Sequence, residues 1–141
     1  MMYQDVVIVI PAYEPDERLL ELLKNIRDKE NHAFDIVLVD DGSGVEFASL
    51  FATAQSNYAC HLQRHAENKG KGRALKTAIS YILDNFPNAK GIVTIDSDGQ
   101  HTYEDMMKCL AEFFCNILIV WCWVLEHLKN LFLYVVNLEI Y

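Results

Sequence analysis

The feature of the sequence that most limits its fold is a series of short apolar runs separated by helix-like segments. The β-branched run over residues 6–10 is continuous, as expected of a strand buried on both faces. Similar runs over residues 36–39 and 91–95, and a weaker one near residues 59–64, predict three more strands. Strands that alternate with helices form parallel sheets with right-handed crossovers. The sequence therefore predicts an α/β fold, with a mainly parallel sheet flanked by helices.

The segments between these runs carry helix signals. Apolar residues recur at helical spacing over residues 19–26, after a proline and acidic residues suited to a first turn. A weaker helix is expected around residues 46–54, and an amphipathic one from near Ala74 to residue 86. Thr102 with Asp105 resembles a capping box that opens a helix through about Phe114.

Length, charge and cysteine usage narrow the class of protein. The 141 residues suit one domain. The net charge of −8 argues against a nucleic-acid partner, because neutralising phosphates needs a surplus of Lys and Arg. The four cysteines form no CxxC pair and indicate neither a zinc site nor a disulfide framework. The first residues lack the pattern of a secretory signal, so we expect a cytoplasmic protein, either free or at the inner face of the membrane.

Polar clusters follow the carboxyl ends of three expected strands. They comprise residues 11–14, 40–43 and 96–101, and they consist mainly of acids and turn-forming residues. In open α/β sheets ligands bind along that edge. Three clusters at equivalent points therefore predict a single site.

Asp96 and Asp98 are the strongest candidates for metal ligands. Two carboxylates one residue apart can reach the same hard cation where the backbone turns, and Gly99 permits such a turn. Mg²⁺ or Mn²⁺ prefers oxygen ligands and keeps positions for substrate phosphates. The amide oxygen of Gln100 could supply a further ligand. The alternative is that these acids only form a turn and a helix cap.

Two further segments suit parts of a nucleotide. Asp41, at a strand end, can accept the N–H of a nucleobase, and the following Gly-Ser turn lets a ring approach the backbone. Residues 68–73 place glycines and three basic side chains before a helix, which suits phosphates. An ordinary turn and a solvated basic loop are the respective alternatives. The five histidines form no ligand pattern, and all except His101 are expected at the surface or in loops.

Taken in order, these motifs resemble the family-2 glycosyltransferases of the Rossmann-like GT-A fold. Residues 9–14 (Val-Ile-Pro-Ala-Tyr-Glu) and 39–43 (Val-Asp-Asp-Gly-Ser) are similar to the family's first two strand ends. Residues 68–75 resemble its N-x-GKGxAL segment, and residues 95–101 resemble its metal motif. The resemblance is strongest to the dolichol- and polyprenyl-phosphate sugar transferases and covers residues 5–114. Glu14 replaces the usual Asn, and Tyr103 replaces the usual Pro.

The resemblance implies a role for each motif. The first strand end and Asp41 would cradle the base and ribose, Lys71 would lie near the base or phosphates, and Asp96 would lie near the sugar. The implied nucleotide-sugar site comprises Pro11, Ala12, Tyr13, Glu14, Asp41, Lys71 and Asp96. The implied ligands of Mg²⁺ or Mn²⁺ are Asp96, Asp98 and Gln100.

The implied reaction is metal-dependent, inverting transfer of a sugar from a UDP or GDP donor to a polyprenyl phosphate or a growing glycan. Two alternatives remain open: a non-catalytic nucleotide-sugar-binding remnant, and a haloacid-dehalogenase-type phosphatase, whose DxDG step residues 96–99 mimic. Residues 1–114 would form the donor-binding subdomain. The apolar tail of residues 115–141 departs from the family pattern, supplies no recognisable catalytic base, and could cause self-association.

Overall fold

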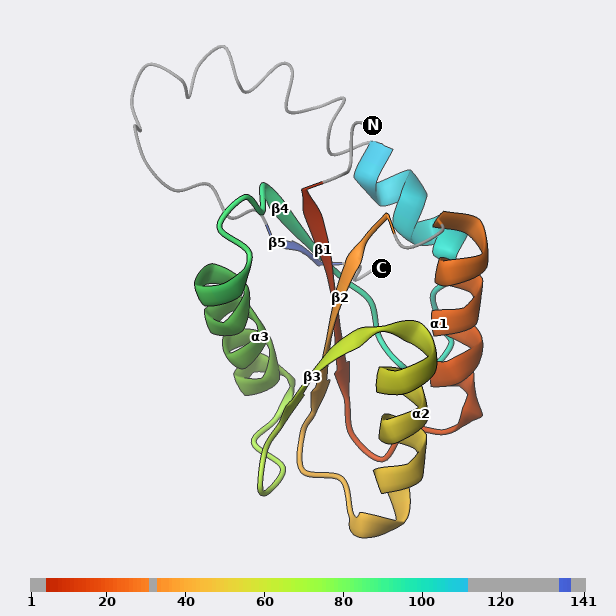
Figure 1. The fold of residues 1–141 in the computed structure, drawn as a ribbon, viewed down its shortest axis with the longest axis vertical. Helices are drawn as coiled ribbons and strands as arrows, with labels where there is room; N and C mark the ends of the chain where they lie inside the picture. The colour runs from red at the N-terminus through yellow and green to blue at the C-terminus, as the bar shows by residue number, and fades with distance from the viewer. Residues whose placement is uncertain (1–4, 31–32, 112–134, 138–141) are drawn as a thin grey trace.

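A computed structural model of the chain describes residues 5–30, 33–111 and 135–137. Within this part, one five-stranded sheet has the order β3-β2-β1-β4-β5, and every pair of neighbouring strands is parallel (Figure 1). The strands are β1 (Val6–Ala12), β2 (Asp35–Asp40), β3 (Cys60–Arg64), β4 (Gly91–Thr94) and β5 (Val135–Asn137). The expected α/β class and parallel sheet are confirmed.

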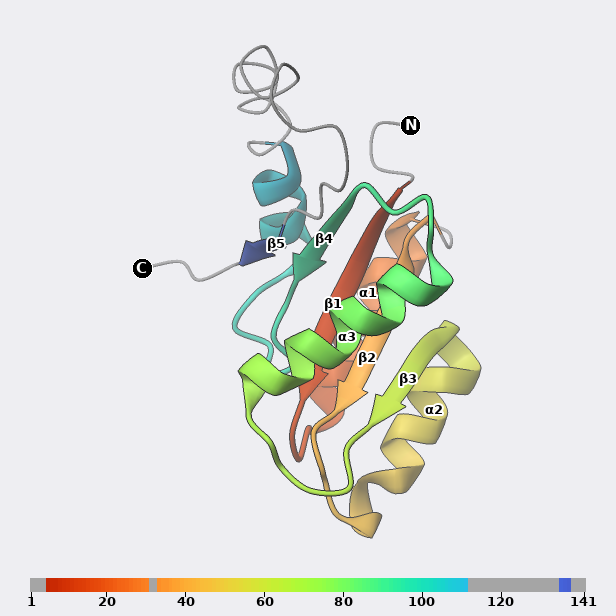
Figure 2. The ribbon, with the colours of Figure 1, turned by 90° about the vertical axis from the view of Figure 1, so that its left-hand side faces the viewer.

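Helices cover both faces of the sheet. The helices α1 (Glu17–Glu30) and α2 (Ala48–Tyr58) lie on one face, and α3 (Lys71–Asn85) lies on the other (Figures 1 and 2). A short 3₁₀ segment, η1 (Val45–Phe47), leads into α2. Residues 103–111 are also helical, and Met106 and Leu110 pack into the core on the side of α1. The sheet is therefore the middle layer of three.

The two central strands are buried on both faces, as their continuous apolar runs predict. Alternate residues of β1 and β2 point to opposite sides, because side chains alternate along a strand. Ile8, Ile10, Ile36 and Leu38 belong to the core under α1 and α2. Val7, Val9, Val37 and Val39 belong to the core under α3. This double burial fixes the register of the sheet and hence the positions of the strand ends.

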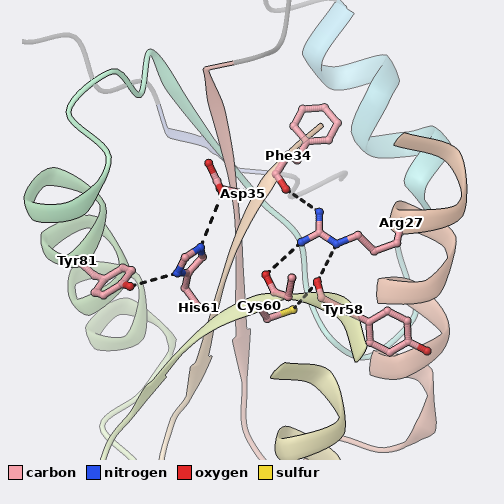
Figure 3. Close-up of polar contacts among 8 residues, drawn as sticks. Arg27, Phe34, Asp35, Tyr58, Cys60, His61 and Tyr81 are labelled. Atoms are coloured by element: carbon pink, nitrogen blue, oxygen red, sulfur yellow. Dashed lines mark hydrogen bonds and ion pairs between the residues drawn. The ribbon is translucent and has the colours of Figure 1, made fainter. Parts of the chain in front are cut away.

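At the amino ends of the strands, Arg27 joins three segments of backbone (Figure 3). Its guanidinium donates to the carbonyl oxygens of Phe34 at 2.7 Å, Tyr58 at 2.8 Å and Ala59 at 3.3 Å. These carbonyls lie just before β2 and β3, where the sheet cannot satisfy them. Burial lowers the pKa of Arg27. The side chain thus ties the last turn of α1 to the start of both strands.

The helices differ from the sequence prediction in one useful respect. The predicted start of the third helix near Ala74 is wrong, because α3 begins at Lys71. Gly70 occupies the N-cap with φ of 87°, and its carbonyl accepts the N–H groups of Arg73 and Ala74. The second half of the glycine-rich basic segment, residues 71–73, therefore forms the first turn of α3, and residues 68–70 lead into it. The capping box is confirmed, since Thr102 and Asp105 exchange backbone-to-side-chain hydrogen bonds.

The tail is described only in part. Residues 112–134 and 138–141 lie outside the described residues. The predicted helix end at Phe114 falls among them, and self-association through the tail stays a prediction. The backbone of β5 pairs with β4, with Ile92 opposite Val135. The boundary at residue 114 stays a prediction. In the described part of the chain, every helix is too short or too polar to cross a bilayer.

Candidate functional site

A cleft of about 250 Å³ opens at the carboxyl ends of the central strands. Here β1 lies between β2 and β4, so the chain leaves β1 toward one side of the sheet and later returns to its other side. Ligands of open α/β sheets bind at such a switch point. The cleft is lined by Pro11, Ala12, Tyr13, Asp41, Asn68, Gly70, Lys71, Ala74, Asp96, Ser97 and Asp98.

The end of β1 forms the floor of the cleft and one wall. Pro11 and Ala12 are buried, whereas Tyr13 is 49% exposed at the cleft. Glu14 has a φ of 47°, and its N–H donates to the Ser43 hydroxyl at 2.8 Å. This bond ties the loop after β1 to the turn after β2. Glu14 is not among the residues that line the cleft, although the sequence placed it in the site.

The two adjacent acids after β2 have different surroundings. The Asp40 carboxylate accepts the Ser43 N–H at 2.9 Å and lies 3.7 Å from Arg64, so it stabilises its own turn. Asp41 lines the cleft, and its N–H donates to the Ala12 carbonyl at 2.8 Å. Asp41 is therefore the acid of this pair that can meet a ligand.

The Asp41 carboxylate is held by donors from the loop after β3. Its Oδ1 lies 2.6 Å from His65 Nδ1 and accepts the Lys69 N–H at 3.0 Å. Burial alone would raise the pKa of Asp41, but hydrogen bonds from the Lys69 amide, the His65 ring and the Gly70 amide outweigh it and lower the pKa. Asp41 consequently remains an ionised acceptor at neutral pH.

Gly42 lets the loop after β3 approach the turn after β2. Its φ is 79°, and an added Cβ would lie 2.2 Å from the carbonyl carbon of Glu67 and 2.3 Å from the amide nitrogen of Asn68. Both contacts are with backbone, which cannot move aside like a flexible side chain. A residue without a side chain is thus required where the two loops meet beside the cleft.

The first turn of α3 forms the opposite wall. The Lys71 ammonium lies 3.0 and 3.1 Å from the two carboxylate oxygens of Asp96, which follows β4. Gly70, at the N-cap, has no side-chain cap, and a Cβ added to it would meet nothing within 4 Å, so the space beside it is open. The turn therefore places a cation and the amino end of a helix beside the cleft, where both favour an anion.

The two acids after β4 suit a shared hard cation. Asp96 and Asp98 both line the cleft, and Asp98 Oδ1 accepts the Gln100 N–H at 3.0 Å, which shapes the loop. The Gln100 side chain is exposed and lies outside the cleft lining. Among the described residues, no three His, Cys, Asp or Glu side chains converge on one point. The donor set fits Mg²⁺ or Mn²⁺ held by one or two carboxylates and completed by substrate oxygens.

The structure brings most of the expected residues together and corrects the view of one histidine. His65 is in a loop, as predicted, but its side chain is only 8% exposed and contacts Asp41 and Thr77. Nothing in the local sequence marks this contact, because its partners are 24 and 12 residues away. Asn68 also lines the cleft, and it lies in the segment of residues 68–73 that the sequence indicates for phosphates. His32 and His127 lie outside the described residues.

Most of the chain, including the residues that line this cleft, matches a known protein family. The model of glycosyl transferase family 2 matches residues 7–140, which include every strand end described above. The chain belongs to glycosyl transferase family 2. The family assignment agrees with the α/β fold and with the order of the motifs along the chain.

Relatives in this family are longer than the chain. It is 38% identical over 104 residues to an uncharacterized protein of Methanocaldococcus jannaschii, covering 74% of this chain and 40% of that protein. It is 32% identical over 111 residues to the undecaprenyl-phosphate 4-deoxy-4-formamido-L-arabinose transferase of Pseudomonas savastanoi, covering 75% of this chain and 32% of that enzyme. The chain thus spans about a third to two fifths of these family-2 relatives.

One solved structure is also similar. It is the mannosyltransferase PcManGT from Pyrobaculum calidifontis in complex with GDP-Man and Mn²⁺, at 28% sequence identity. The match covers 55% of this chain and 24% of that one, with a TM-score of 0.45.

Proposed function

We propose that this family-2 chain binds the sugar donor of a metal-dependent glycosyltransferase. The donor is a UDP- or GDP-sugar, and the acceptor is a polyprenyl phosphate or a growing glycan. The observation that carries the proposal is the single cleft in which Asp41, Lys71, Asp96 and Asp98 meet at the switch point of the sheet. Asp41 could accept the N–H of a base, Lys71 could meet phosphate, and Asp96 with Asp98 could hold a metal, all within the same cleft.

The nucleobase would lie against the end of β1 and the turn after β2. Asp41 is ionised and can only accept, so it can take the ring N–H of uracil or guanine. Tyr13 offers a half-exposed ring beside it, and Pro11 with Ala12 supplies an apolar floor. This part of the cleft therefore suits the uridine or guanosine end of the donor.

The diphosphate would lie between the first turn of α3 and the loop after β4. Lys71 and the amides near Gly70 attract the phosphates, while Asp96 and Asp98 would hold Mg²⁺ or Mn²⁺, with Gln100 as a further ligand from the loop. The bound metal would neutralise charge on the departing diphosphate as a Lewis acid. Lys71 would orient Asp96 and, once the donor is bound, would help to neutralise the charge of the phosphates.

The acceptor and the cellular location are proposed from the family. The name of the Pseudomonas savastanoi relative includes undecaprenyl phosphate, which supports a polyprenyl-phosphate acceptor and a site at the inner face of the membrane. Inverting stereochemistry is part of the same proposal. The family match favours the transferase over the phosphatase alternative.

Calorimetric titration of UDP and GDP onto the full chain, with MnCl₂ or with EDTA, tests the proposal. We expect saturable binding of at least one nucleotide that is lost in EDTA. Asp98→Asn should weaken the metal-dependent binding at least tenfold, because one of the two carboxylates in the cleft is removed. Equal affinity with and without metal would contradict the metal role, and no binding of either nucleotide would contradict the donor-site assignment.

A further inference from the structure

His65 is a buried titratable side chain next to the cleft. The proposed function gives this side chain no task. Both of its ring nitrogens have partners: Nδ1 lies 2.6 Å from Asp41 Oδ1, and Nε2 lies 2.8 Å from Thr77 Oγ1. The His65 side chain is 8% exposed and does not line the cleft. It therefore acts on a ligand only through the groups that it touches.

The partners determine which atoms of this chain donate. The Asp41 carboxylate accepts only, because its pKa is lowered, so His65 Nδ1 carries the hydrogen and donates to it. The Thr77 hydroxyl can then donate to Nε2. The imidazole ring is thus fixed at both ends, and it presents one donor to one oxygen of Asp41.

The same bonds connect the two halves of the cleft. Asp41 stands at the base end, whereas Thr77 belongs to α3, whose first residue, Lys71, pairs with Asp96 at the diphosphate end. His65 itself is anchored to the sheet edge, because its N–H donates to the Asp40 carbonyl at 2.8 Å. One imidazole therefore bridges the Asp41 carboxylate and α3.

We propose that His65 is a positioning residue for recognition of the donor base. It holds the Asp41 carboxylate in the orientation that accepts the N–H of uracil or guanine, and Thr77 holds the imidazole. This inference rests on the proposed donor site. Without His65, the backbone donors at Lys69 and Gly70 remain, but the carboxylate loses the ring donor that fixes its orientation, so each bound nucleotide has to order it again.

The chain contains a matched control at the other end of β3. His61 is also bonded through its ring, with Nδ1 3.3 Å from the Tyr81 hydroxyl and Nε2 3.8 Å from Asp35 (Figure 3). Its ring also meets Phe86 edge-on, with the ring centres 5.0 Å apart. It lies toward the amino ends of the strands, away from the cleft. Replacing His61 removes comparable contacts without touching Asp41.

The test is titration of UDP and GDP, each with Mn²⁺, onto the full chain and four variants. His65→Leu should weaken binding tenfold or more. His65→Asn should recover most of that loss, because its Nδ2 can donate to Asp41 as Nδ1 does. Thr77→Val should weaken binding a few-fold, since the ring loses one support. His61→Leu should bind like the unchanged chain.

A second readout needs no nucleotide. Titration of the Asp41 carboxyl by NMR should show its pKa rising in His65→Leu, because a donor to the ionised form is lost, and staying low in His65→Asn and His61→Leu. A role of His65 in folding alone would lower stability without separating His65→Leu from His65→Asn in this way.

The outcomes separate this inference from the function on which it rests. Binding by the unchanged chain, with equal affinity in His65→Leu and an unmoved Asp41 pKa, overturns the inference alone. An unchanged chain that binds neither nucleotide overturns the proposed function and the inference with it. Should His65→Leu not fold, Thr77→Val provides the test: a few-fold loss of affinity supports the inference, and unchanged affinity overturns it.

Discussion

The two ends of the sheet use polar groups in opposite ways. At the amino ends, Arg27 satisfies three backbone carbonyls and has no role in the cleft. At the carboxyl ends, side chains contact one another, as in the pairs Asp41–His65 and Lys71–Asp96, and leave a cleft between them. Backbone carbonyls cannot exchange their partner for a ligand without exposing the strand ends, whereas side-chain pairs can. The first end should therefore control stability and the second end binding.

We expect the largest loss of stability at Gly42, where the loop after β3 packs against the turn after β2. Gly42→Ala should lower the free energy of unfolding by at least ~3 kcal/mol and weaken nucleotide binding, because the new Cβ meets backbone at 2.2 Å and the φ is positive. Gly70→Ala also faces a positive φ, with ψ of 156°, but the added Cβ meets open space, so it should cost less, about 1–2 kcal/mol. Denaturant unfolding of both variants measures the difference. Equal losses would show that the loop after β3 moves freely.

The amino end should give the clearest loss of stability without loss of binding. Arg27→Met should lower the free energy of unfolding by roughly 2–3 kcal/mol, because three carbonyls lose their donor. The folded variant should keep its nucleotide affinity. Arg18→Met, in the same helix, removes an exposed pair with Asp16 and keeps the apolar stem beside Gly99, so it should change stability by less than about 0.5 kcal/mol. A binding loss in Arg27→Met would break the division between the two ends.

The reverse pattern is expected at the metal site. Asp98→Asn should weaken Mn²⁺-dependent nucleotide binding at least tenfold, or about 1.4 kcal/mol, with little change in unfolding. Asp28→Asn makes the same charge change at an exposed position of α1 and should leave the affinity unaltered. Calorimetry with Mn²⁺ compares the two variants. Similar weakening in both would mean that net charge, and not a metal ligand, controls binding.

The smallest effect should appear at the helix that follows the metal loop. Thr102→Ala removes the hydroxyl that accepts the Asp105 N–H at 3.2 Å and should cost about 1 kcal/mol of stability. Thr53 is a matched control, because its hydroxyl only donates to the Ser49 carbonyl within α2. Thr53→Ala should be nearly neutral in thermal unfolding. A nucleotide affinity that changes in Thr102→Ala would place this cap within the binding end as well.

Much of the fold could be predicted because it depends on local pattern. Continuous apolar runs predict β1, β2 and β4, and the capping box predicts a helix start. The predicted start of α3 is wrong because glycines argue against a helix, whereas here Gly70 provides an N-cap with positive φ. The pairing of β5 with β4 could not be foreseen, since nothing in a sequence fixes the partner of a short distant strand.

The residues of the candidate site could largely be predicted from the sequence, whereas the hydrogen bonds between them could not. Strand ends announce where Asp41, Asp96 and Asp98 gather, because parallel strands end at one edge. The bond from His65 to Asp41 depends on the close approach of two loops at Gly42, which only the folded chain shows. The positions of Glu14 and Gln100, outside the cleft lining, are likewise beyond a sequence pattern.

The cleft takes its lining from strand ends and loops that lie far apart in the chain, from residue 11 to residue 98. Folding and donor binding must then be thermodynamically linked, since the unfolded chain has no comparable place for a nucleotide. Free nucleotide at a hundred times its dissociation constant would add about 2.7 kcal/mol to the stability of the folded state. Donor concentration in the cell would thereby influence how long each molecule of this protein survives unfolding and proteolysis.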